Sequence, residues 1–115
     1  MKLAIIGARN LVVENLEDYI PSNCDEIVSG GARGIDKCAE DFAHRKAIRL
    51  TVFLPDYKRF GRGAPLKRNE EIAQYSDCAI AFWDGRSKGT QYSIKLFEKL
   101  GKPVKFVIIQ PDASI

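Results

Sequence analysis

Glycine and arginine recur together in several loops of this 115-residue chain. The loops are GARN (7–10), GGARGID (30–36), PDYKRFGRG (55–63) and DGRSKGT (84–90), and each follows an apolar run. Glycine lets backbone N–H groups approach a ligand closely, and the arginine guanidinium presents a fork of donors that matches a phosphate. We therefore expect these loops to bind an anion.

A glycine-rich loop can also be a plain corner between a strand and a helix, so the individual motifs need weighing. Neither G-x-G-x-x-G nor G-x-x-x-x-G-K-[ST] occurs in these loops, which excludes the two best-known phosphate motifs. In DGRSKGT, Thr90 is read equally well as a phosphate contact and as a helix N-cap. Asp36 is read as a first-turn carboxylate that stabilises its own helix rather than as a catalytic group.

The hydrophobic pattern shows which elements would position these loops. Short apolar runs predict strands at 2–6, 26–29, 50–55, 78–83 and 103–109, and apolar residues at helical spacing predict helices over 11–20, 35–43, 65–75 and 92–100. Strands that alternate with helices imply a parallel sheet covered on both faces. The predicted fold is α/β, a Rossmann-like, doubly wound three-layer sandwich with a five-stranded parallel sheet. All the glycine–arginine loops then lie at the carboxyl edge of that sheet, where such folds bind ligands.

Composition and length predict a single soluble domain. Hydrophobic residues make up 45% of the chain and charged residues 29%, the ordinary globular range. We expect one domain over residues 1–110 and a frayed tail at 111–115. No apolar run approaches the ~20 residues of a membrane helix, and the first apolar run is too short for a signal peptide. We expect a cytoplasmic protein with no membrane partner.

The metal-ligating residues are few and scattered. Cys24, Cys38 and Cys78 form no C-x-x-C pair, and His44 is the only histidine. This spacing does not match a zinc site, so we expect no metal and no cofactor. We expect three mostly buried thiols in a reducing compartment, and a surface histidine.

A basic stretch, YKRFGRGAPLKRN, runs from residue 57 to 69 with no acidic residue. A charge run of this kind is usually a solvated loop. It is also compatible with a positive rim for an anionic ligand or, with its aromatic residues, with a surface for single-stranded nucleic acid. Tyr57 and Trp83 are candidates for stacking on a base, and equally for rim or core packing.

Several motifs together resemble a known family. VSGGARGID, LPD, RN..I, AFWDGRSKGT and GKPV occur in the order found in the SLOG superfamily, which joins the DNA-processing protein A (Smf) domain and the LOG cytokinin-activating enzymes. The resemblance covers roughly residues 1 to 109 and is closest to small stand-alone bacterial and phage proteins of the YspA or YpsA type. It implies a Rossmann-like fold that binds a nucleotide or nucleotide-derived ligand and associates with itself as a homo-oligomer.

One departure from the LOG pattern bears on activity. LOG enzymes carry P-G-G-x-G-T-x-x-E, whose glutamate takes part in cleaving a nucleoside monophosphate. The matching stretch here is DGRSKGTQYS, and Ser93 stands at the glutamate position. A serine cannot stabilise a developing sugar cation as a carboxylate does. We therefore expect a binding module with no catalytic residue, and the alternatives are a LOG-like phosphoribohydrolase and a DNA-processing-protein-like binder of single-stranded DNA.

In this interpretation the glycine loops approach the ligand through their backbone, Arg9 and Arg33 pair with phosphate, and Asp56 and Asp84 accept from ribose hydroxyls. The full set of expected ligand contacts is Gly7, Arg9, Gly30, Gly31, Arg33, Gly34, Asp56, Arg68, Asn69, Asp84, Gly85, Ser87, Gly89 and Thr90.

Overall fold

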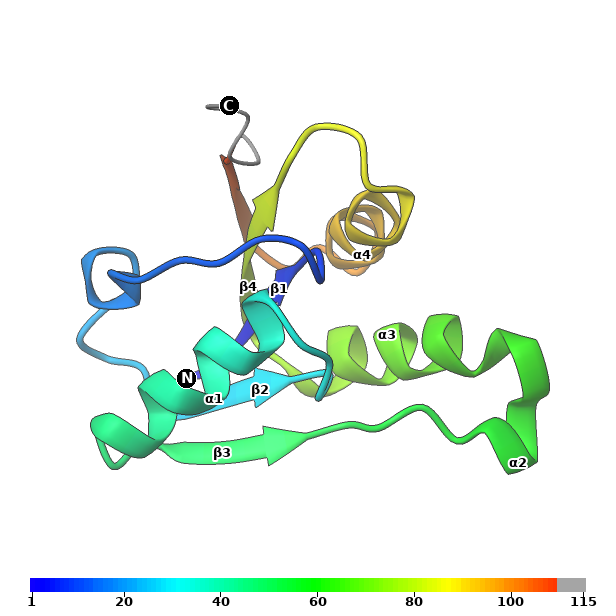
Figure 1. Cartoon of the computed structure of the whole chain (residues 1–115), viewed down its shortest axis with the longest axis horizontal. Coiled ribbons are helices and arrows are strands. Elements are labelled where there is room, and N and C mark those ends of the chain that lie inside the picture. Colours follow the sequence, from blue (N-terminus) through cyan, green and yellow to red (C-terminus); the bar gives the residue numbers. More distant parts are fainter. Residues whose placement is uncertain (110–115) are drawn as a thin grey trace.

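The computed structural model describes residues 1–109 and contains one five-stranded, all-parallel sheet (Figure 1). Its strands are β1 (Lys2–Gly7), β2 (Glu26–Ser29), β3 (Arg49–Val52), β4 (Cys78–Trp83) and β5 (Val104–Ile108), in the order β3-β2-β1-β4-β5. Helices cover both faces, so the predicted Rossmann-like three-layer fold is confirmed. The predicted frayed tail lies outside the described residues.

Different helices cover the two faces of the sheet. Helix α1 (Ile35–Arg45) covers one face, while α3 (Ala64–Tyr75) and α4 (Lys88–Lys99) lie together on the other side of β1 and β4 (Figure 1). Alternate strand residues point to opposite faces, which divides the core in two. The α1 side includes Ile5, Ile27, Phe42 and Phe82, and the α3–α4 side includes Ala4, Val28, Ala73 and Phe97.

The helix predicted over 11–20 is wrong. Only Leu16–Asp18 forms a single 3-10 turn. Leu11 and Val13 are buried, but Val12 between them is 66% exposed. This two-residue alternation belongs to an extended chain, and β-branched valines favour that conformation. The first glycine–arginine loop therefore has no helix N-terminus behind it.

The connection between β3 and α3 is more structured than its sequence suggested. The predicted third strand ends early, at Val52, and the following loop contains a short helix, α2 (Tyr57–Phe60), and a 3-10 turn at Gly61–Gly63. Pro65 lies in the first turn of α3, as predicted. Leu66 was expected to face inward, but its side chain is 47% exposed.

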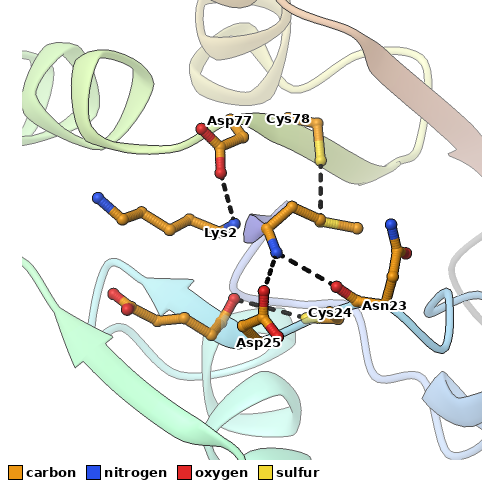
Figure 2. A network of polar contacts seen from close by, with 8 residues as sticks. Lys2, Asn23, Cys24, Asp25, Asp77 and Cys78 are labelled. Carbon is orange, nitrogen blue, oxygen red and sulfur yellow. Dashed lines mark hydrogen bonds and ion pairs between the residues drawn. The ribbon is translucent and has the colours of Figure 1, made fainter.

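A polar network joins β1 to its neighbours at the amino edge of the sheet (Figure 2). The Met1 ammonium pairs with Asp25 and donates to the Asn23 carbonyl at 3.2 Å. The Lys2 backbone N–H donates to Asp77 Oδ2 at 2.7 Å, and the Cys78 thiol contacts the Met1 sulfur at 3.5 Å. These contacts join neighbouring segments at the amino edge of the sheet. The glycine loops lie at the opposite, carboxyl edge.

The remaining sequence predictions concern thiols, metals and membranes. All three cysteines are free, but they are half-buried rather than mostly buried. His44 is exposed, as predicted. Across residues 1–109 no cluster of side chains is suited to a metal ion, and no helix there has the length and apolarity to cross a membrane.

Candidate functional site

A cavity of about 430 Å³ opens at the carboxyl ends of β1 and β2, between the starts of α3 and α4. Several predicted ligand contacts line it: Gly7, Arg9, Gly30, Arg68, Asn69, Ser87, Gly89 and Thr90. The chain leaves β1 on the α1 side of the sheet, whereas α3 and α4 lie on the other side. The main cavity is therefore at the topological switch point, where doubly wound sheets bind ligands.

A second hollow of about 320 Å³ adjoins the main cavity on the β3 side. Its lining consists of Arg9, Gly30, Gly31, Ala32, Arg33, Pro55 and Arg68. Arg9, Gly30, Ala32 and Arg68 line both spaces and form a shared wall. The predicted Gly31 and Arg33 are thus brought to the second hollow rather than to the main cavity.

The start of α4 contributes hydroxyl groups to the main cavity. Ser87 is the N-cap, and its Oγ accepts from the Thr90 N–H at 3.5 Å, so the cap reading of Thr90 is wrong. Thr90 is buried and its Oγ1 lies 3.3 Å from Ser87 Oγ. Ser93, one turn further, is only 5% exposed and also lines the cavity. The positive end of a 12-residue helix thus faces this space together with these hydroxyls.

Asp36 is a functional candidate that the sequence analysis set aside in favour of a structural role. It does lie in the first turn of α1, as predicted, but its side chain also lines the main cavity and is only 8% exposed. Its Oδ2 accepts from the Ala32 N–H at 3.1 Å, which leaves acceptor positions of the carboxylate unused. Burial raises the pKa of Asp36, while Arg68 and Arg9 act in the opposite direction. The only signal in the sequence was its place inside the GGARGID loop.

Arg68 is held in place across the shared wall. Its Nη1 donates to the Gly30 carbonyl at 2.5 Å and its Nε donates to Asn69 Oδ1 at 2.9 Å. Partial burial lowers the pKa of Arg68, and the charge of Asp36 opposes that shift. A Cβ on residue 30 would lie 2.9 Å from Arg68 Nη1 and 3.0 Å from Asp36 Oδ2. Glycine at position 30 therefore leaves room for the arginine and the carboxylate together.

Two of the predicted glycines pack the loops against each other. A Cβ on Gly7 would lie 2.4 Å from the Ile35 side chain. A Cβ on Gly34 would lie 2.4 Å from the Arg9 carbonyl oxygen. Gly34 lines neither space, so a glycine is needed there for the close packing of two loops and not for contact with a ligand.

Asp56, Asp84 and Gly85 also line neither space. Asp56 Oδ1 accepts from the Arg59 N–H at 3.2 Å and caps α2. Asp84 Oδ1 accepts from the N–H groups of Arg86 and Ser87, both at 2.8 Å, and these bonds lower the pKa of Asp84. The two carboxylates proposed for ribose hydroxyls thus lie outside both spaces, and Asp36 is the carboxylate in the lining of the main cavity.

The two aromatic candidates also lie outside the cavities. Trp83 Nε1 donates to the Ser87 carbonyl at 3.0 Å, and the indole meets Phe106 edge to face with centroids 6.1 Å apart. Tyr57 is exposed on α2. Trp83 therefore positions the loop that carries the α4 N-cap.

Comparison with known proteins gives one relative. The Gene 61 protein of Mycobacterium phage D29 is 34% identical over 84 residues, which cover 68% of this chain and 67% of the phage protein. This chain belongs to the family of that phage protein. The relative's name states neither a ligand nor a reaction. No family model matches the chain, and no solved structure matches it significantly.

Proposed function

We propose that this protein is a binding module for a nucleotide or a nucleotide-derived, phosphate-bearing ligand at the carboxyl edge of its sheet. One observation carries the proposal: Arg9, Arg68 and the N-terminus of α4 converge on one cavity. Within residues 1–109, neither arginine forms an ion pair with a carboxylate. The charged residues of the lining are two arginines and one carboxylate, Asp36, so the net charge is positive, and positive charge beside helix N–H groups favours an anion.

The rest of the lining supports a nucleotide rather than a bare phosphate. A volume of about 430 Å³ falls in the usual range for small-molecule sites. Thr90 and Ser93 supply hydroxyls for a phosphate, and Asp36 has acceptor capacity for sugar hydroxyls. Leu66 and Ile72 add apolar surface that suits a base.

The resemblance to the SLOG superfamily, including its DNA-processing protein A and LOG members, agrees with this proposal and stays a prediction. So does the expected homo-oligomer, and so does the single-stranded nucleic-acid partner suggested by the basic stretch. We also propose a cytoplasmic location, which the three free cysteines suit because that compartment is reducing.

Calorimetry with AMP and ADP-ribose tests the binding proposal. Arg9→Gln removes a guanidinium that lines both spaces, and Arg62→Gln removes one from the exposed 3-10 turn outside them. A lost charge-assisted hydrogen bond of about 1.5–3 kcal/mol corresponds to roughly 10- to 150-fold weaker binding. We expect that loss for Arg9→Gln alone. Absence of binding by folded protein at millimolar ligand, or equal losses in both variants, would contradict the proposal.

A LOG-like phosphoribohydrolase is the second candidate, because Asp36 places a buried carboxylate in the cavity. A carboxyl group whose pKa burial raises is suited to proton transfer. Ser93 at the LOG glutamate position argues against it. Incubation with AMP separates the two: release of adenine that is lost in Asp36→Asn would establish the enzyme, and intact AMP would exclude it for this nucleotide.

A further inference from the structure

Three arginines line the second hollow. Arg9 follows β1, Arg33 lies in the loop between β2 and α1, and Arg68 lies on α3. Its lining contains no acidic residue, and none of these arginines has an ion-pair partner within the described part of the chain. Asp36, on the side of the main cavity, offsets part of the charge of Arg68 and Arg9. The three arginines still outnumber this one carboxylate, so the net positive charge favours an anion.

This anion position is distinct from the one at the start of α4. Arg33 lines only the second hollow, whereas Ser87 and Thr90 line only the main cavity. Arg9 and Arg68 belong to the shared wall and face both spaces. The two spaces therefore offer two anion positions, one on each side of a common wall.

Asp36 borders that wall on the side of the main cavity. Its Oδ2 accepts from the N–H of Ala32, a residue of the shared wall, at 3.1 Å. A carboxylate repels a phosphate placed beside it and favours a hydrogen-bond donor. Two directly linked phosphates would bring negative charge to this point, whereas a sugar between them would bring a hydroxyl.

We propose that the second hollow is a second anionic subsite, and that the ligand class is a nucleotide with two phosphate groups separated by its sugar. A nucleoside 3′,5′-bisphosphate has this chemistry. The inference rests on the proposed function, because it assumes that the first phosphate binds at α4. Arg33 is then the specificity-determining residue for the second phosphate, and Asp36 accepts a hydrogen bond from a hydroxyl group of the sugar.

Titration calorimetry with AMP, ADP and adenosine 3′,5′-bisphosphate tests the subsite. ADP is the matched control, because it has the same two phosphate groups directly linked. We expect the 3′,5′-bisphosphate to bind about tenfold or more tightly than ADP, the effect of one charge-assisted contact. Arg33→Gln should abolish this difference. The matched variant Arg86→Gln, which removes a guanidinium outside both spaces, should retain it.

The outcomes separate the two proposals. Equal binding of ADP and the 3′,5′-bisphosphate, or a difference that survives in Arg33→Gln, overturns the second subsite, while AMP binding still supports the proposed function. If none of the three ligands binds, the proposed function fails and the inference falls with it. Arg33 is exposed, so circular dichroism of Arg33→Gln is expected to match that of the parent protein.

Discussion

The substitution Gly34→Ala tests whether this glycine packs two loops together or contacts a ligand. Gly34 precedes α1 with φ +74° and ψ −126°, a conformation that residues with a Cβ rarely adopt. A Cβ there would lie 2.4 Å from the Arg9 carbonyl oxygen and 2.7 Å from that of Ala8. Both contacts are with backbone, which cannot rotate away as a side chain can.

Two costs add in the Gly34→Ala variant. A backbone held in a sparsely populated region costs about 1–3 kcal/mol, and a forced contact in a packed region costs about 1–3 kcal/mol. We expect a loss of about 2–6 kcal/mol in the free energy of unfolding, a large part of the roughly 5–15 kcal/mol of a typical domain. The corresponding fall in Tm is about 8 °C or more.

Gly85→Ala is the matched control. Gly85 also has a positive φ, +82°, but a Cβ there would meet no atom within 4 Å. Only the conformational cost of about 1–2 kcal/mol remains. Urea unfolding followed by circular dichroism measures both variants. If Gly34→Ala unfolds no more easily than Gly85→Ala, the packing argument is refuted. A weaker ligand affinity at unchanged stability would instead make Gly34 a ligand contact.

Two further predictions concern side-chain hydrogen bonds to the buried Glu26 of β2 and to the end of α3. Tyr75 Oη and Thr51 Oγ1 donate to Glu26 Oε2 at 2.5 and 2.7 Å, and these bonds lower the pKa of Glu26. The two bonds therefore stabilise the folded protein fully above the carboxyl pKa of the unfolded chain. This stabilisation is lost as the pH falls through the lower pKa of the folded state. Tyr75→Phe should lower the free energy of unfolding by about 1–2 kcal/mol at pH 7 and by less at pH 3, as measured by guanidinium unfolding. An equal loss at both pH values would contradict this account. Lys102 Nζ donates to carbonyls at the end of α3 at 2.7–2.8 Å. Lys102→Met should cost about 1.5–3 kcal/mol, and the exposed Lys99→Met much less, when thermal unfolding is compared.

Much of the fold was predictable because its signals are local. Each strand is a short apolar run, and the bounds of 26–29 and 78–83 were correct. The segment 11–20 failed for an equally physical reason. Its apolar residues satisfy both a helical and a two-residue spacing, and only packing against the sheet selected the extended form.

The candidate site was predictable in location but not in detail. A parallel sheet brings every loop after a strand to one edge, and the loops there line two adjoining spaces, with Arg9 at both, Thr90 at the main cavity and Arg33 at the second hollow. Asp56 and Asp84 have the same residue type as Asp36, but they cap their own loops. Residue type alone does not show which of these carboxylates lines the cavity.

The sequence by itself determined the order of the five strands and of α1, α3 and α4, and the edge at which the glycine–arginine loops meet, because both follow from hydrophobic pattern and parallel topology. Only the tertiary structure decided that Arg68 bonds to Gly30, 38 residues away, and that Asp36 is buried beside them. It alone also placed Arg9 and Arg68 in the wall that two spaces share, and Arg33 at the second hollow only. These features depend on contacts between segments distant in the chain, and no local pattern records such contacts.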